Sequence, residues 1–424
     1  MLGERVGLSP ARSVLANGTT VLVKPTRAIP AVTISVAMRA GSVCDPVDAP
    51  GSIHLLSRVI DRGTATRTAL EIAEDLDGRG ATLTTTVTRH SLTLSCACLA
   101  DDFHAVLALL GDIVMAPSLP EEELEKRKAE VITAIRQDED HPAVRATEAL
   151  MALLYPDPHP YGRPSKGRIE VVDGLTRERL LQLHDARFSP RALCVVIVGD
   201  VAIDDAAAAA ERVFGGWPAR EPAPIALPPV VENAVRRRLV IPMMNKAQAD
   251  VAYGFATITR ADPAYYACWL MNNVLGQFSM GGRLGDSIRE RQGMAYYVYS
   301  RLDANVARGP LSIYAGVSPD NVDRAVASID EEVGRLVRDG VTAKELNESR
   351  QYLVGSMPRE FETNSGIANF LQMAEFFGLG LDFDVRLPEL LHAVTLDDLH
   401  AAARRLLDPA RATIVIAGPY RDHE

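Results

Sequence analysis

The sequence predicts an α+β fold with two similar α/β-sandwich domains that arose by internal duplication. Three observations lead to this prediction: a strand-to-helix segment occurs twice, a similar helix start follows each copy, and a Pro-rich stretch separates the halves. The chain has 424 residues, of which 47% are hydrophobic and 24% are charged. That length and composition are typical of a globular protein with two domains.

The repeated segments are residues 91–109 and 310–329. Each begins with alternating apolar residues, which predict a strand, and reaches an Asp (Asp101 or Asp320) before a helical pattern starts. Each half also ends in an apolar run closed by Gly, at 193–201 and 412–419, which predicts a buried strand.

The helix after each repeated segment is predicted to begin with a capping box. Ser118 stands three residues before Glu121, and Thr342 stands three residues before Glu345. In this motif, the hydroxyl and the carboxylate accept hydrogen bonds from backbone N–H groups at the helix start.

Residues 215–236 are rich in Pro and have no hydrophobic periodicity, which is typical of a linker. We therefore predict an N-terminal domain over 1–214 and a C-terminal domain over 237–424.

Composition disfavours several classes of function. A net charge of −10 argues against nucleic-acid binding, which needs a basic surface. No apolar run approaches the ~18 residues that span a bilayer, so no membrane partner is expected. The N-terminus lacks a basic-then-apolar signal pattern, which favours a cytoplasmic location. The five cysteines are odd in number and irregularly spaced, and they do not indicate a disulfide framework.

Residues 81–95 are polar, rich in Thr and β-branched, as in an edge or half-exposed strand. An exposed edge can bind an extended peptide as an additional strand, which makes Thr84, Thr85 and Thr86 candidate substrate-binding residues. An ordinary solvated hairpin is the alternative.

Residues 51–64, GSIHLLSRVIDRGT, almost contain the zinc motif H-x-x-E-H. His54 is present, but Ser57 replaces the Glu and Arg58 replaces the second His. Ser cannot act as the general base for a metal-bound water, and protonated Arg has no lone pair for a cation. The segment therefore predicts that the catalytic zinc site is lost, and His54 is then a packed core residue.

Residues 283–300 place Arg289 near a predicted helix end and Tyr296 near the start of the next strand, with Gly293 between them. Both side chains can then face one cavity. Arg can hold a peptide carbonyl or carboxylate, and a Tyr hydroxyl can donate to a developing oxyanion. The alternative is a surface Arg and a Tyr at the edge of the core.

These pieces, in this order, resemble the pitrilysin/insulinase-type zinc peptidases, the inverzincins that include mitochondrial processing peptidase. The resemblance covers nearly the whole chain and is most specific at Arg289 and Tyr296. The family's third zinc ligand is a Glu, and Ala134 stands at the matching position. The matching segments are 16–46, 51–64, 130–142, 187–201 and 283–300.

The resemblance implies a heterodimer in which two chains close like a clamshell around a peptide. This chain would be the non-zinc subunit of a metalloendopeptidase, inactive alone, and would supply Arg289 and Tyr296 to a homologous zinc-bearing partner. Zinc and the catalytic Glu would come from that partner, and this chain would bind no cofactor. A separate physical hypothesis is that the Arg58 guanidinium occupies the space of the lost metal and pairs with an acid, so that the fold no longer depends on zinc. The alternative is a catalytically inactive peptide-binding or scaffold protein of the same fold.

Overall fold

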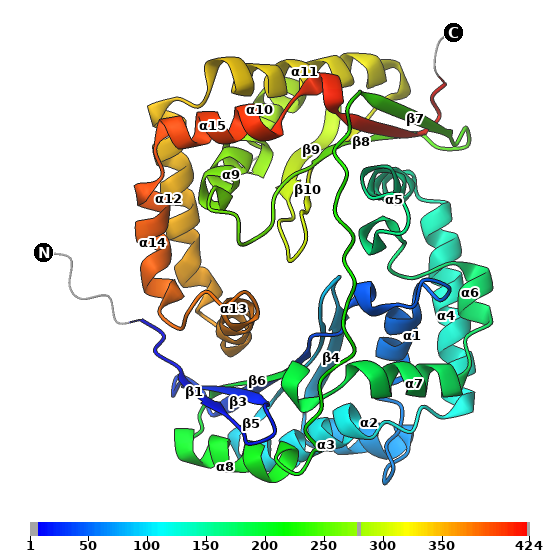
Figure 1. Cartoon of the computed structure of the whole chain (residues 1–424), viewed down its shortest axis with the longest axis vertical. Coiled ribbons are helices and arrows are strands. Elements are labelled where there is room, and N and C mark those ends of the chain that lie inside the picture. The colour runs from blue at the N-terminus through cyan, green and yellow to red at the C-terminus, as the bar shows by residue number, and fades with distance from the viewer. Residues whose placement is uncertain (1–6, 278–280, 422–424) are drawn as a thin grey trace, which may run out of the picture. The chain divides into compact units, whose positions relative to one another are not determined.

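The structure is a computed structural model that describes residues 7–277 and 281–421 (Figure 1). The described residues form two β-sheets with helices packed against them, which confirms the predicted α+β class. The strand orders are β1-β2-β6-β3-β5-β4 in the first sheet and β7-β11-β8-β10-β9 in the second.

The two sheets repeat one topology. In the first, β2 runs parallel to β6, and β6, β3, β5 and β4 pair in antiparallel fashion. In the second, β7 runs parallel to β11, and β11, β8, β10 and β9 pair in antiparallel fashion. This match confirms the predicted duplication. The strands are β1 (Ala11–Val14), β2 (Thr20–Pro25), β3 (Ala31–Met38), β4 (Thr82–Val87), β5 (Leu92–Leu99), β6 (Leu193–Gly199), β7 (Arg237–Pro242), β8 (Ala249–Ala256), β9 (Ala295–Leu302), β10 (Pro310–Val317) and β11 (Thr413–Gly418).

Amphipathic helices cover the sheets. Helices α3, α8 and α13 pack against the first sheet, and α5 and α11 pack against the second. The helices are α1 (Ser52–Val59), α2 (Ala69–Gly78), α3 (Phe103–Met115), α4 (Glu121–Glu139), α5 (Pro142–Leu154), α6 (Ile169–Asp173), α7 (Arg177–Arg187), α8 (Ile203–Phe214), α9 (Tyr265–Asn272), α10 (Gly282–Leu284), α11 (Val322–Asp339), α12 (Ala343–Glu360), α13 (Asn364–Phe376), α14 (Phe383–Ala393) and α15 (Leu396–Leu406).

The chain divides into two compact units that are not contiguous in sequence. One contains residues up to 135, 164–226 and 357–385, and the other contains 136–163, 227–356 and the residues after 385. The predicted N-terminal domain, 1–214, holds all strands of the first sheet, and the predicted C-terminal domain, 237–424, holds all strands of the second. Helix α5 of the N-terminal half, however, belongs to the unit of the second sheet, and helix α13 of the C-terminal half belongs to the unit of the first.

Helix α13 follows the second sheet in sequence and packs on β3 and β6 of the first. Its Gln372 accepts a hydrogen bond from Ser35 and donates one to Thr93 at 3.0 Å. Helix α5 likewise packs on β8 and β11. A Cβ at Gly254 would lie 3.1 Å from Leu150, so glycine allows α5 to approach β8 closely.

One of the two predicted capping boxes is confirmed. Thr342 and Glu345 exchange backbone and side-chain hydrogen bonds at the start of α12. The box at Ser118 is wrong, because α4 begins at Glu121. Leu119 has a φ of 45°, and the Ser118 carbonyl accepts a hydrogen bond from Arg177 instead. Leu119, which would be the first helical residue after a Ser118 cap, is therefore left-handed rather than helical.

Residues 218–233 form no helix or strand. We expect that a chain cut at a protease site inserted there stays together in native buffer, because α5 and α13 each complete the unit of the other fragment. Size-exclusion chromatography of the cut chain checks this expectation. Separation of the fragments without denaturant would contradict it.

None of the helices in the described ranges combines the length and the apolar character needed to cross a membrane.

Candidate functional site

The degenerate metal position lies on α1. His54 is half-buried, Ser57 is buried, and Arg58 is exposed. The Ser57 hydroxyl donates a 2.6 Å hydrogen bond to the His54 carbonyl oxygen, which lies one turn earlier in the same helix.

Arg58 pairs with Glu130 on α4, with 3.5 Å between Nη2 and Oε2. Arg58 thus pairs with an acid, and its replacement of the lost metal stays a prediction. Both side chains are about half exposed, at 50% and 47%, so the pair contributes little to stability. Arg127 also donates to Glu130, at 2.6 Å.

The residues at this position do not fit a zinc ion. Zinc sites use imidazole, thiolate or carboxylate ligands, whereas the matching positions here hold one imidazole, a hydroxyl, a guanidinium and the methyl group of Ala134. Across residues 7–277 and 281–421, no three His, Cys, Asp or Glu side chains are grouped as a metal site.

Strand β4, which contains Thr84, Thr85 and Thr86, ends the first sheet. The predicted edge strand is therefore confirmed. Thr84 and Thr86 are exposed, and the Oγ1 atom of Thr85 is buried without a hydrogen-bond partner among the described residues. The backbone of β4 on its outer side can accept a further strand, and substrate binding there stays a prediction.

Arg289 lies in a π-helical segment, Gly285–Arg291, that follows α10. The turn into α10 requires glycine at 281, where φ is 109° and a Cβ would lie 2.6 Å from the Val298 carbonyl oxygen. Gly293 ends the helix with a φ of 63°, and its N–H donates to the Arg289 carbonyl at 3.0 Å. The predicted helix stop is thus confirmed.

Tyr296 lies at a β-bulge on the edge strand β9. Tyr297 pairs with Gly316 and Ala295 pairs with Val317, so Tyr296 has no opposite residue on β10. Bulges of this kind redirect side chains and are common at sheet edges and near active sites. Tyr296 is 83% exposed, so the alternative of a Tyr at the edge of the core is wrong.

A hollow of about 390 Å³ lies beside β9. Arg289 lines it from the π-helical segment, and Arg301 lines it from β9. Tyr296 is not part of the lining, so the prediction that Arg289 and Tyr296 face one cavity is wrong for this hollow. The other lining residues are Gly276, Gln277, Gly281, Tyr297, Val298, Tyr299 and Ser300.

Two guanidinium groups, those of Arg289 and Arg301, line this hollow, and Glu290 and Asp250 place two carboxylates beside it. The carboxylate of Glu290 is 3.7 Å from Arg289, and both side chains are solvent-accessible, so this pair is weak. Tyr297 donates a 2.5 Å hydrogen bond to Asp250, and burial and this bond raise the pKa of Tyr297. The hollow can thus bind a carboxylate or carbonyl through guanidinium groups.

Sequence reasoning missed Arg301 and its neighbours Tyr297 and Tyr299. Alternate residues of a strand share a face, so the pattern Tyr-x-Tyr-x-Arg at 297–301 was the available signal. The Tyr299 ring also packs against Tyr314 of β10, with 5.3 Å between ring centroids.

Family comparisons agree with these features. The profile of the insulinase family, peptidase family M16, matches residues 20–163. The profile of the peptidase M16 inactive domain matches residues 174–353. Together the two profiles cover well over half of the chain.

An uncharacterised zinc protease of Mycobacterium bovis is 28% identical over 419 residues, which are 97% of this chain and 94% of that protein. The uncharacterised zinc protease YmxG of Bacillus subtilis is 27% identical, and the match covers 95% of this chain and 96% of YmxG. The crystal structure of a peptidase M16 inactive domain from Pseudomonas fluorescens has a TM-score of 0.90 and 26% identity, with 98% of this chain and 100% of that chain covered. A protease from Helicobacter pylori shares the fold, with a TM-score of 0.90 at 16% identity and coverage of 96% and 99%. The chain therefore belongs to the insulinase family of peptidases, family M16.

Proposed function

We propose that this chain is the non-zinc subunit of a heterodimeric zinc metalloendopeptidase. One observation carries the proposal: a metal position without its ligands on α1 occurs in the same chain as Arg289 and an outward-pointing Tyr296 at a sheet edge. A side chain that is 83% exposed on a bulge is available to the active site of another chain.

The two residues have different roles in this proposal. The Tyr296 hydroxyl donates a hydrogen bond to the oxyanion that forms when the peptide carbonyl is attacked. The Arg289 guanidinium binds a carbonyl or carboxylate of the substrate and fixes its position. A homologous partner supplies zinc and the general base, and the two chains close around the peptide.

The proposed substrate is an extended peptide, and one feature of each unit supports this by itself. The free edge of β4, with Thr84 and Thr86 exposed, supports binding by strand addition. The hollow with Arg289 and Arg301 supports recognition of carbonyl or carboxylate groups.

A catalytically inactive peptide-binding or scaffold protein is the second candidate. The β4 edge favours this function equally, because strand addition needs no catalytic residue. The identity of the partner separates the two candidates.

Affinity purification of the native chain from its source cells, with mass identification of bound proteins, tests the proposal. We expect an unlike chain of similar size that carries an intact H-x-x-E-H motif. Recovery of this chain alone, or of a large assembly without such a chain, would support the scaffold and contradict the peptidase.

A further inference from the structure

The segment that carries Arg289 needs support from its surroundings. It consists of the short α10 and the π-helical Gly285–Arg291. π-Helical turns are rare and occur frequently at functional sites. The side chains of this segment and the Gln292 that follows it make polar contacts with α11 and with the start of α12.

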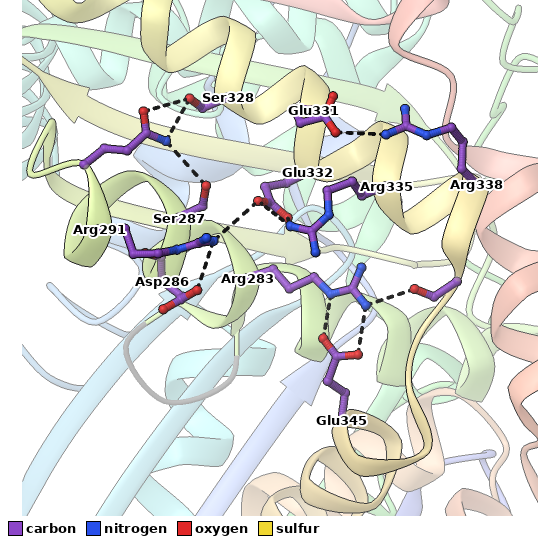
Figure 2. Close-up of polar contacts among 12 residues, drawn as sticks. Arg283, Asp286, Ser287, Arg291, Ser328, Glu331, Glu332, Arg335, Arg338 and Glu345 are labelled. Atoms are coloured by element: carbon purple, nitrogen blue, oxygen red, sulfur yellow. Dashed lines mark hydrogen bonds and ion pairs between the residues drawn. The ribbon is translucent and has the colours of Figure 1, made fainter.

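Arg283 makes the strongest of these contacts (Figure 2). Its Nε and Nη2 atoms donate to the two Glu345 oxygens at 2.6 and 2.8 Å, and Nη2 also donates to the Gly340 carbonyl at 2.9 Å. The side chains of Arg283 and Glu345 are only 13% and 27% exposed. A two-pronged pair with this burial is stronger and better defined than an exposed ion pair.

Glu345 is itself held in place by the start of α12. Its carboxylate accepts hydrogen bonds from the Thr342 N–H at 2.8 Å and from the Thr342 hydroxyl at 2.7 Å. Partial burial acts to raise the pKa of Glu345, but the hydrogen bonds from Arg283 and Thr342 outweigh it and lower the pKa to about 2. The carboxylate is thus charged and oriented at neutral pH.

The contacts at the other end of the segment are weaker. Arg291 is 59% exposed and lies 3.1 Å from Asp286 and 3.9 Å from Glu332. Gln292 donates to Ser328 of α11 at 3.1 Å, a neutral and exposed hydrogen bond. Arg283 is therefore the main polar attachment of the segment.

We propose that the Arg283–Glu345 pair is a positioning device that holds Arg289 toward the hollow beside β9. Arg283 precedes Arg289 by six positions in the same segment. One guanidinium makes three hydrogen bonds here, and a lysine ammonium cannot reproduce this fork. This role rests on the proposed function, in which Arg289 binds substrate.

The test uses Arg283→Lys and Glu345→Gln in the complex with the zinc-bearing partner. Gln at position 345 retains the capping box but loses the charged pair. We expect kcat/KM to fall by about tenfold to a hundredfold, mainly through KM, because a displaced Arg289 binds substrate poorly. Unchanged KM in both variants would overturn the positioning role.

Arg236→Gln is the matched control for stability. Arg236 makes a two-pronged pair with Asp330 on α11, at 2.8 Å for each contact. We expect its loss to lower Tm about as much as Glu345→Gln does and to leave KM unchanged. An equal rise of KM in the control would show a general stability effect and overturn the proposal.

A double variant tests whether the pair acts through Arg289. Glu345→Gln should add no further loss of kcat/KM to Arg289→Gln, because the positioned side chain is already absent. Independent, multiplicative losses would overturn the positioning role. A fully active Arg289→Gln variant would instead refute the proposed function itself. A deficient Arg289→Gln variant beside fully active Arg283→Lys and Glu345→Gln would refute the positioning role alone.

Discussion

Replacing Tyr296 with Phe should lower kcat of the assembled peptidase by about 10²- to 10³-fold, the usual cost of one lost oxyanion donor. KM should change little, because the hydroxyl acts in the transition state rather than in substrate binding. Tm should also stay the same, because Tyr296 is 83% exposed and makes little packing contact. Steady-state kinetics and thermal unfolding of the two complexes measure these effects.

Tyr352→Phe is the matched control. Tyr352 lies on α12, is 38% exposed and is not among the residues that line the hollow beside β9. The same substitution there should leave kcat within about twofold of the parent, as for a surface change without a catalytic contact. Equal losses at both positions, or no loss at Tyr296, would contradict the assigned role.

The second large effect concerns the metal. The triple variant Ser57→Glu, Arg58→His and Ala134→Glu should bind about one zinc ion per chain, because it restores three protein ligands and the base. Position 134 lies one helical turn after Glu130, which already reaches Arg58, so the new Glu lies on the face of α4 toward α1.

Metal analysis after dialysis checks this prediction. The parent chain should retain no zinc, and Arg58→His alone should bind much more weakly than the triple variant because it lacks the carboxylate ligand. One tightly held zinc per parent chain, removed by His54→Ala, would contradict the absence of a metal site.

Much of the fold was predictable because local patterns encode it. The alternating segments at 91–99 and 310–317 became β5 and β10, the Thr-rich strand became the edge strand β4, and Thr342 with Glu345 formed the capping box. In each case, residues adjacent in sequence fix the backbone conformation.

The exchange of α5 and α13 was not predictable. An amphipathic pattern shows that a helix has an apolar face, but it does not show on which sheet that face packs. The failed capping box at Ser118 has a similar cause, because the distant Arg177 holds the Ser118 carbonyl. Tertiary contacts overrode the local signal at both places.

The candidate site shows the same division. The segment 283–300 indicated Arg289 and Tyr296, and the glycine at position 293 indicated the end of the helix. The bulge that exposes Tyr296 depends on the pairing of β9 with β10, and the ion pair of Arg283 depends on Glu345 of α12. Neither feature has a signal in the neighbouring residues alone.

In the most direct test, increasing amounts of this chain are added to a zinc-bearing homologous subunit purified from the same source cells, and the rate of peptide hydrolysis is measured. We predict that activity rises from a low baseline and saturates at equal amounts of the two chains. The same titration with the Arg289→Gln, Tyr296→Phe double variant should give a complex of the same stoichiometry with little activity. A zinc subunit whose activity does not change on addition of this chain would contradict the shared active site.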